Sequence, residues 1–207
     1  MRGRVWPSTL FKYAYWPKEK EDENRRFRQF LKTRCTLGLD EIDRRVFETT
    51  RRVWAGIDCT ACANCCREMR PTFSEEEIDR VACRLGIERQ QFIETYLERS
   101  ESNSENPWQP RAIPCPFLKD NLCSVYEERP AECSGYPYLY KPDFVFRTMG
   151  MIGRTFTCPI VYEVMVELKK ALGFLQTASR PPLKSGERES EAPSPHRDQN
   201  GKGAEIR

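Results

Sequence analysis

The chain has 207 residues, enough for one domain with an apolar core of its own. Its 34 basic and 31 acidic residues leave a formal net charge of only +3, which excludes the strong positive field that would attract nucleic acids or anionic membranes. The N-terminus is basic but lacks the uninterrupted apolar run that a signal peptide or a membrane-spanning helix requires, so we predict a cytoplasmic protein.

The first quarter of the chain is predicted to form an arm followed by two helices. Residues 1–20 carry several aromatic side chains close to prolines, which predicts an irregular arm. From about Glu19 onward, apolar residues recur at helical spacing in a highly charged segment. The same periodicity predicts a second helix over residues 40–54.

Two more helices are predicted after a central run of cysteines. Ser74 and Glu77 have the spacing of a capping box, which satisfies free backbone N–H groups at the start of a helix, and Gly86 is a natural stop. A further helix is predicted over residues 88–99. Cys83 lies next to the apolar stripe of the first of these helices, and we interpret it as a small buried residue rather than a metal ligand.

The following segment is rich in prolines and turn residues. Residues 100–114 read as a polar loop, and Asp120-Asn121 suits a turn between two short extended pieces. Three prolines between residues 116 and 137 exclude a long regular helix. We therefore predict an irregular, cysteine-rich metal-binding lobe here.

The last part of the ordered chain is predicted to contain one strand and one helix. Residues 144–146 are apolar and β-prone, which predicts a short strand, and a final helix follows Cys158-Pro159. Residues 178–207 hold too few apolar side chains to fold, so we predict a disordered tail. The expected architecture is one mainly α domain over residues 21–177, with little β structure and with helices packed around a thiolate metal site.

Ten cysteines are the strongest chemical signal in the sequence. In a reducing compartment they are not expected to pair, whereas in an oxidising one an even count would permit five disulfides. Cys59, Cys62 and Cys65 are each separated by two residues, which lets a tight loop aim successive thiolates at one centre. The adjacent Cys65 and Cys66 are expected to project in different directions, so one of the pair is assigned to a second centre or a second iron. Met69 stands where a simple ferredoxin run would have its fourth cysteine.

Four remote cysteines lie in proline-rich or turn-rich surroundings, so eight thiolates could form two four-sulfur sites or one cluster with spare residues. The sole histidine, His196, lies in the predicted tail, which disfavours a mixed cysteine and histidine site. An all-sulfur shell selects zinc or an iron–sulfur cluster, and we favour a 4Fe–4S cluster over zinc. The predicted metal ligands are Cys59, Cys62, Cys65, Cys66, Cys115, Cys123, Cys133 and Cys158.

Several other side chains near these cysteines have two interpretations. Arg67, Arg70 and Arg129 are placed to offset the negative charge of a thiolate site, or are ordinary solvated arginines. The glutamates of residues 127–132 are interpreted as solvated charges rather than catalytic acids. Tyr126 is interpreted as part of a packed turn, with a buried ring and with Arg129 bonded to backbone carbonyls, in preference to a substrate contact.

The stretch "CTACANCC" followed by "CPFLKDNLCSVYEERPAECSGYP" resembles the YkgJ-type cysteine-cluster proteins, a family of zinc- or iron-chelating domains. The resemblance covers about residues 59–158 and implies metal binding by the cysteines of the two stretches, with Cys158 as an addition. Cys35 and Cys83 fall outside the motif. Asp58 stands where family members often have an aromatic residue, a departure that could alter solvent access to the site.

Three functions follow from these features. The first is an accessory protein that carries an iron–sulfur cluster and works with a protein or redox partner. The second is a structural zinc module whose surface binds a partner protein. The third is a metal-dependent enzyme of the methyltransferase type, although no acid, base or nucleotide-binding constellation supports a particular reaction.

Overall fold

The computed structural model describes residues 18–100 and 105–177, and the fold over this range is mainly helical with four short strands. The predicted tail and all but the last three residues of the predicted arm lie outside the described residues. Residues 18–20 belong to the first described helix. Among the described helices, none has both the length and the apolar character needed to cross a membrane.

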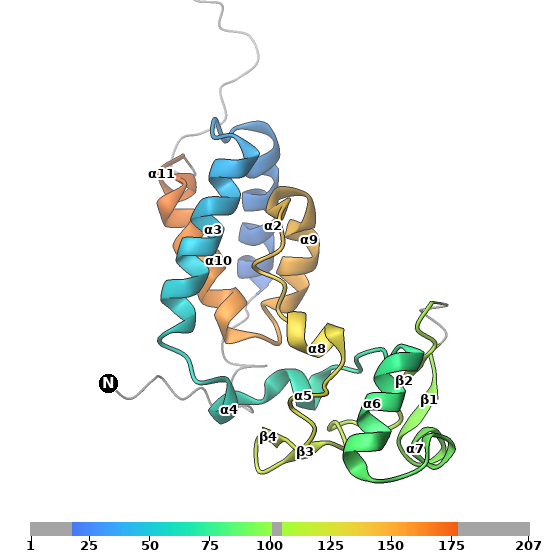
Figure 1. The fold of residues 1–207 in the computed structure, drawn as a ribbon. Helices are drawn as coiled ribbons and strands as arrows, with labels where there is room; N and C mark the ends of the chain where they lie inside the picture. The colour runs from blue at the N-terminus through green and yellow to red at the C-terminus, as the bar shows by residue number, and fades with distance from the viewer. Residues whose placement is uncertain (1–17, 101–104, 178–207) are drawn as a thin grey trace, which may run out of the picture.

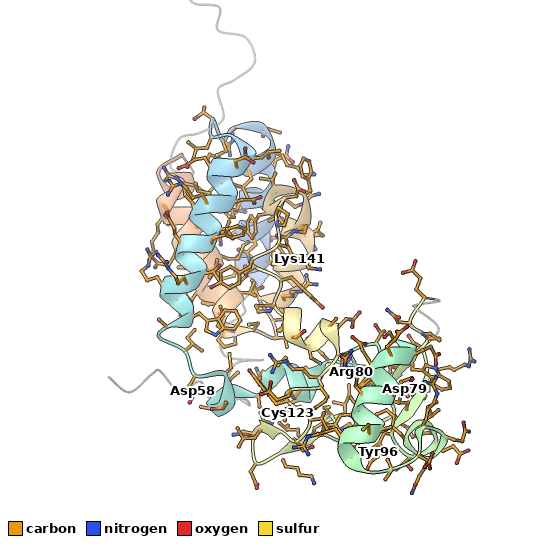
Figure 2. All side chains as sticks on the ribbon, in the orientation of Figure 1. Asp58, Asp79, Arg80, Tyr96, Cys123 and Lys141 are labelled. Atoms are coloured by element: carbon orange, nitrogen blue, oxygen red, sulfur yellow. The ribbon has the colours of Figure 1, made fainter. Side chains whose placement is uncertain are left out.

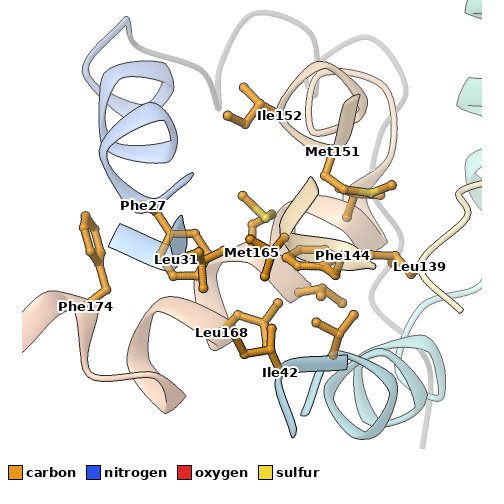
Figure 3. Packing of buried hydrophobic residues seen from close by; sticks show 14 of the residues in the cluster. Phe27, Leu31, Ile42, Leu139, Phe144, Met151, Ile152, Met165, Leu168 and Phe174 are labelled. Atoms are coloured by element: carbon orange, nitrogen blue, oxygen red, sulfur yellow. The ribbon is translucent and has the colours of Figure 1, made fainter. Parts of the chain in front are cut away.

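Five helices form a bundle in the upper part of Figure 1. They are α2 (Lys18–Thr33), α3 (Leu39–Trp54), α9 (Phe144–Arg154), α10 (Pro159–Ala171) and the short α11 (Phe174–Thr177). Their apolar faces meet in one core, seen from close by in Figure 3. The largest fully buried members of this core are Phe27, Ile42, Leu139, Phe144, Met151, Ile160, Met165 and Phe174.

The periodicity of the sequence accounts for α3. Ile42, Val46, Thr49 and Thr50 are buried along one face, and the acidic first turn and basic last turn complement the helix dipole. The predicted helix over residues 40–54 is therefore confirmed. The final helix is confirmed as well, with Pro159 in its first turn, where a missing N–H costs no hydrogen bond.

The predicted strand at residues 144–146 is wrong, because this segment begins α9. Asp43 of α3 accepts hydrogen bonds from the backbone N–H groups of Asp143 (2.7 Å) and Phe144 (2.9 Å), which satisfies two free donors at the helix start. Residues 144, 145, 148, 151 and 152 are then buried at helical spacing. A cap from a distant helix and a continued period of about 3.6 residues outweigh the local β propensity.

A smaller lobe packs around a second apolar core. It contains α6 (Glu75–Leu85), α7 (Arg89–Tyr96) and the antiparallel pair β1 (Leu97–Arg99) and β2 (Trp108–Pro110), in which Leu97 faces Pro110. The helix predicted over residues 88–99 thus ends at Tyr96 and continues as a strand. The buried members of this core are Phe73, Ile78, Val81, Ala82, Phe92, Leu97, Phe117 and Val125.

The capping box at the start of α6 is confirmed. The Glu77 N–H donates to the Ser74 hydroxyl at 3.3 Å, and the Ser74 N–H donates to the Glu77 carboxylate at 2.9 Å. Gly86 ends the helix with φ of 68°, a left-handed conformation that glycine adopts without strain. Cys83 is exposed, however, so its interpretation as a buried residue is wrong.

The cysteine-rich segments lie between the bundle and the lobe (Figure 1). They include α4 (Cys59–Cys62), α5 (Asn64–Glu68), the antiparallel pair β3 (Leu118–Lys119) and β4 (Leu122–Cys123), and α8 (Ala131–Gly135). The long helices therefore pack around an apolar core of their own, with the cysteine region beside it.

Candidate metal centre

The sequence "CTACANCC" folds into two one-turn helices joined at Ala63. Asp58 begins the first turn, where its carboxylate accepts hydrogen bonds from the Thr60 N–H at 2.9 Å and the Thr60 hydroxyl at 2.6 Å. Ala63 has φ of 48°, a left-handed conformation that ends α4 and starts α5. The departure at Asp58 thus gives the cysteine run a helix cap.

Cys65 and Cys66 lie side by side in α5, with their sulfur atoms 4.0 Å apart. The hydrogen bond from Cys66 lowers the pKa of the Cys65 thiol and raises that of Cys66, so Cys65 is the first of the pair to ionise. Backbone N–H groups and the positive charge of Arg129 also favour the Cys65 thiolate. Cys65 is therefore a ready thiolate donor at neutral pH.

A backbone hydrogen bond joins the two halves of the cysteine motif. The Cys115 N–H donates to the Cys66 carbonyl oxygen at 2.8 Å. Cys123 follows in β4, where it pairs with Leu118, and the two-residue turn before it holds Asp120 and Asn121 at φ of 47° and 66°. The predicted turn is confirmed, and it returns Cys123 toward Cys115.

Four of the cysteine sulfurs accept hydrogen bonds from the chain that follows them. In Cys62, Cys115, Cys123 and Cys158 the donor is the backbone N–H two residues later, and Cys115 and Cys158 accept a second bond from the third residue. Burial raises the pKa of each of these thiols, and the N–H donors partly offset that rise. Such donors stabilise a thiolate, the form in which cysteine binds metals.

The negative charge of the Cys65 thiolate raises the pKa of each of the other seven predicted ligands. Burial raises the pKa of six cysteines, and the Cys65 charge raises it further. The Cys65 charge also raises the pKa of Cys66. These effects place Cys65 among Cys59, Cys62, Cys66, Cys115, Cys123, Cys133 and Cys158.

The Cys65 charge acts on all seven other thiols, and those seven fall into two sets by which further charges raise their pKa values. We group Cys65 with the first set because it continues the spacing of Cys59 and Cys62 in the sequence. The bundle-side thiols are Cys59, Cys62, Cys65 and Cys158, where Cys59 senses Cys65 and Cys62, and Cys158 senses Cys65 and Cys59. The lobe-side thiols are Cys66, Cys115, Cys123 and Cys133, where Cys133 senses Cys115, Cys65 and Cys123. Figure 2 labels Cys123 between Asp58 and the lobe residues Arg80 and Tyr96.

The side chains are gathered but not closed around a single point. Within residues 18–100 and 105–177, no three His, Cys, Asp or Glu side chains are already arranged to hold a metal ion. Cys35 lies apart, packed half-buried against the bundle core. Metal binding would therefore draw the thiols together from this starting arrangement.

Two of the three arginines predicted near the cysteines act on them. Arg67 donates to the Cys62 carbonyl oxygen at 2.6 Å and contacts the side chain of Asn121, and its charge lowers the pKa of Cys62 against the rise that burial causes. Arg129 lowers the pKa of Cys65 in the same way. Arg70 instead pairs with Glu98 in the lobe.

The segment before Cys133 is exposed to solvent on one side. Tyr126 is 56% exposed, so the prediction of a buried ring is wrong, whereas Arg129 does donate to the Tyr126 carbonyl oxygen at 3.2 Å. The guanidinium also covers the Tyr126 ring at 3.6 Å, beside a groove of about 330 Å³ that Arg80 and Ser134 help to line. Stacking on the cation accounts for the exposed ring.

The nearby glutamates have structural partners. Glu132 accepts a hydrogen bond from the Thr72 N–H at 2.8 Å, and Glu128 lies 3.5 Å from Arg84. Glu77 accepts from the Ala131 N–H at 2.7 Å in addition to its part in the helix cap. These carboxylates tie α6 and α8 together.

The sequence did not single out Tyr136 or Arg154 as part of the site. Tyr136 lies close enough to Cys158, Cys65 and Cys62 for their charges to raise the pKa of its hydroxyl. Neither residue belongs to a recognisable sequence motif, because its position relative to the cysteines depends on how α8 and α9 pack.

Comparison with known families identifies the central part of the chain. Residues 58–155 match the CxxCxxCC family model, described as "Putative zinc- or iron-chelating domain", which confirms the resemblance. The matched range includes both cysteine stretches and ends just before Cys158. No curated protein and no solved structure matches the chain.

Proposed function

We propose that the CxxCxxCC zinc- or iron-chelating domain of this chain carries an iron–sulfur cluster and serves a protein or redox partner. The observation that carries the proposal is the position of Cys65, whose charge reaches seven other cysteine thiols from three separate segments of the chain. An all-thiolate set of this kind is soft, and zinc and iron–sulfur clusters are the metals it prefers.

The bundle-side thiols are the proposed ligands of a 4Fe–4S cluster. Cys59, Cys62 and Cys65 have the spacing of a ferredoxin run, and the remote fourth member, Cys158, is followed by proline. When bound, such a cluster supplies one-electron transfer, with a potential set by burial and by hydrogen bonds to sulfur. The backbone N–H donors at Cys62 and Cys158 and the nearby Arg67 are residues of this chain that would set it.

The lobe-side thiols favour a second role, that of a structural zinc site. β3 and β4 have two residues each, too few for an independently stable hairpin. Cys115 precedes this hairpin, Cys123 is its last residue, and Cys133 lies in the following helix. A metal ion held by Cys66 and these three cysteines would join the hairpin to α5 and α8 and stabilise the lobe.

The proposal is tested by purifying the full chain under anaerobic conditions and measuring zinc, iron and labile sulfide, together with the absorption spectrum. Iron with sulfide and a brown colour are expected. Cys158→Ser should reduce the iron and sulfide content, whereas Cys133→Ser should leave the iron–sulfur absorption in place. Zinc without sulfide would instead select the structural zinc module, and a protein without either metal would refute both.

A further inference from the structure

Two buried polar atoms near the bundle-side thiols make no hydrogen bond to any described residue. They are the hydroxyl oxygen of Tyr136 and Nε of Arg154. Leaving a buried donor unsatisfied costs its full desolvation penalty, so natural proteins rarely keep one without a reason. A ligand or ion that is bound in the functional state is one such reason.

The Tyr136 hydroxyl is buried without a partner and lies within reach of the charges of three cysteines. Burial raises the pKa of this phenol, and the negative charges of Cys158, Cys65 and Cys62 raise it further. Toward a thiolate, which has no proton to donate, a phenol hydroxyl acts as the hydrogen-bond donor. The ring is held edge-on against Tyr138 at 6.1 Å between centroids, so its direction is fixed by packing.

Arg154 contacts both Cys158 and Tyr138, the neighbours of Tyr136 in the site. Its carbonyl oxygen accepts a hydrogen bond from the Cys158 N–H at 2.8 Å, and its guanidinium lies 4.9 Å from the Tyr138 ring centroid. The space for the guanidinium exists because residue 150 is glycine: a Cβ there would come within 2.6 Å of an Arg154 nitrogen. The positive charge of Arg154 lowers the pKa of the Tyr136 hydroxyl and so partly offsets the rise that burial and the cysteines cause.

We propose that Tyr136 is a positioning residue of the metal centre, whose hydroxyl donates a hydrogen bond to a thiolate of the bundle-side set when metal is bound. This inference rests on the proposed function and adds a residue to it. Thiols lose their protons on binding metal and become strong hydrogen-bond acceptors. The donor that is unsatisfied in the metal-free fold then gains a partner.

Removing the hydroxyl should therefore have opposite effects in the two states. In the metal-free protein, Tyr136→Phe removes an unpaired polar atom and keeps the ring, so the melting temperature should stay the same or rise. In the metal-bound protein the variant loses a hydrogen bond to a ligand, and the affinity for metal should fall about 10- to 100-fold. If Tyr136 had only a packing role, Tyr136→Phe would not lower the metal affinity while leaving the metal-free melting temperature the same or higher.

Tyr138→Phe is the matched control. The Tyr138 hydroxyl already donates to the Glu132 carbonyl oxygen at 2.9 Å, so its loss removes a bond present in both states. We expect a lower melting temperature with and without metal, and an unchanged affinity. The same substitution at two adjacent, packed tyrosines thus separates an effect on the metal site from an effect on the fold.

The experiment uses the full chain after removal of its metal. Zn²⁺ alone is added back in competition with a coloured chelator, and Co²⁺ is added to follow the thiolate-to-metal absorption band. The inference is supported by weaker Zn²⁺ binding and a shifted Co²⁺ band in Tyr136→Phe only. It is overturned if the wild-type protein binds Zn²⁺ and Tyr136→Phe binds it equally well, or if the metal-free variant loses stability. If the wild-type protein binds neither ion, the thiolate site itself is refuted, and the inference with it.

Discussion

The backbone N–H of Cys115 donates a 2.8 Å hydrogen bond to the carbonyl oxygen of Cys66. Cys66 ends the first cysteine run and Cys115 begins the second, so this contact fixes the two halves of the family motif to each other. Because it is made by the backbone, it does not depend on bound metal or on the ionisation of either thiol. The lobe-side thiols are thereby held next to the bundle-side thiols before any metal is present.

Replacing a cysteine inside the cluster should remove metal, and replacing one outside it should not. Cys62 is buried and senses the charge of Cys65, whereas Cys83 is exposed on α6. We expect Cys62→Ser to reduce the metal content markedly and Cys83→Ser to leave it unchanged, as measured by elemental analysis of the purified proteins. Equal metal retention by the two variants would contradict the assignment of the ligands.

Stability should depend on pH in opposite directions with and without metal. Burial raises the pKa of Cys59 to about 11 and those of Cys133 and Cys158 to about 12, above the ordinary thiol value of about 8.5. Between these values the folded metal-free protein binds more protons than the unfolded chain, so its stability falls as the pH rises. Metal requires thiolates, so the metal-bound form should instead lose stability as the pH falls.

Thermal unfolding over a pH series, with and without added Zn²⁺, measures this effect. The melting temperature of the metal-free protein should decline from about pH 8.5 upward, and added Zn²⁺ should reduce the decline. Cys133→Ser should also make the decline shallower, because the variant lacks one thiol whose pKa is raised in the fold. A melting temperature that rises over this window in the metal-free protein would show that burial in the fold does not raise the pKa of these thiols.

Arg129 should strengthen metal binding through its charge. This charge lowers the pKa of Cys65, and it counteracts the rise that burial causes at Cys123. We expect Arg129→Gln to weaken Zn²⁺ binding by about tenfold, with a smaller difference at high salt. Arg84→Gln is the control, because Arg84 is exposed and pairs only loosely with Glu128 at 3.5 Å. The same loss of affinity in both variants would indicate a general charge effect instead.

Asp43 should stabilise the bundle without affecting the metal. Its carboxylate accepts hydrogen bonds from the N–H groups of Asp143 and Phe144 at the start of α9. Asp43→Ala should lower the free energy of unfolding by about 1 kcal/mol, the usual value of a helix cap. Denaturant unfolding measures this change, with the exposed Asp22→Ala as control. A reduced metal content in Asp43→Ala would show that α9 and the cysteine region are coupled more strongly than we expect.

Short-range patterns in the sequence were reliable guides to the helices. The capping box of Ser74 and Glu77, the stop at Gly86 and the turn at residues 120–121 all follow from interactions within a few residues, and the structure has each of them. The strand predicted at residues 144–146 failed because the start of α9 is capped by Asp43, which lies about a hundred residues away in the chain. Its apolar spacing continued to residue 152 and was the signal that was missed.

The exposure of single side chains was less predictable. Cys83 and Tyr126 are both exposed although their residue types and neighbours suggested burial. In each case the outcome depends on which face of a local element meets the core, and on a partner such as Arg129 that stacks on the ring. The residue type gives only the average tendency of a side chain to be buried, not the outcome at one position.

The sequence by itself determined the kind of chemistry, because closely spaced cysteines without an ordered histidine specify a soft, all-sulfur donor set wherever they fold. Only the tertiary structure decided that the charges of Cys65 and Cys59 reach the distant Cys158, and that the Tyr136 hydroxyl is buried without a hydrogen-bond partner among the described residues. Residue spacing governs geometry over a few residues of backbone. The approach of distant segments is governed instead by tertiary contacts such as the Cys115 N–H to Cys66 carbonyl hydrogen bond, which no local pattern encodes.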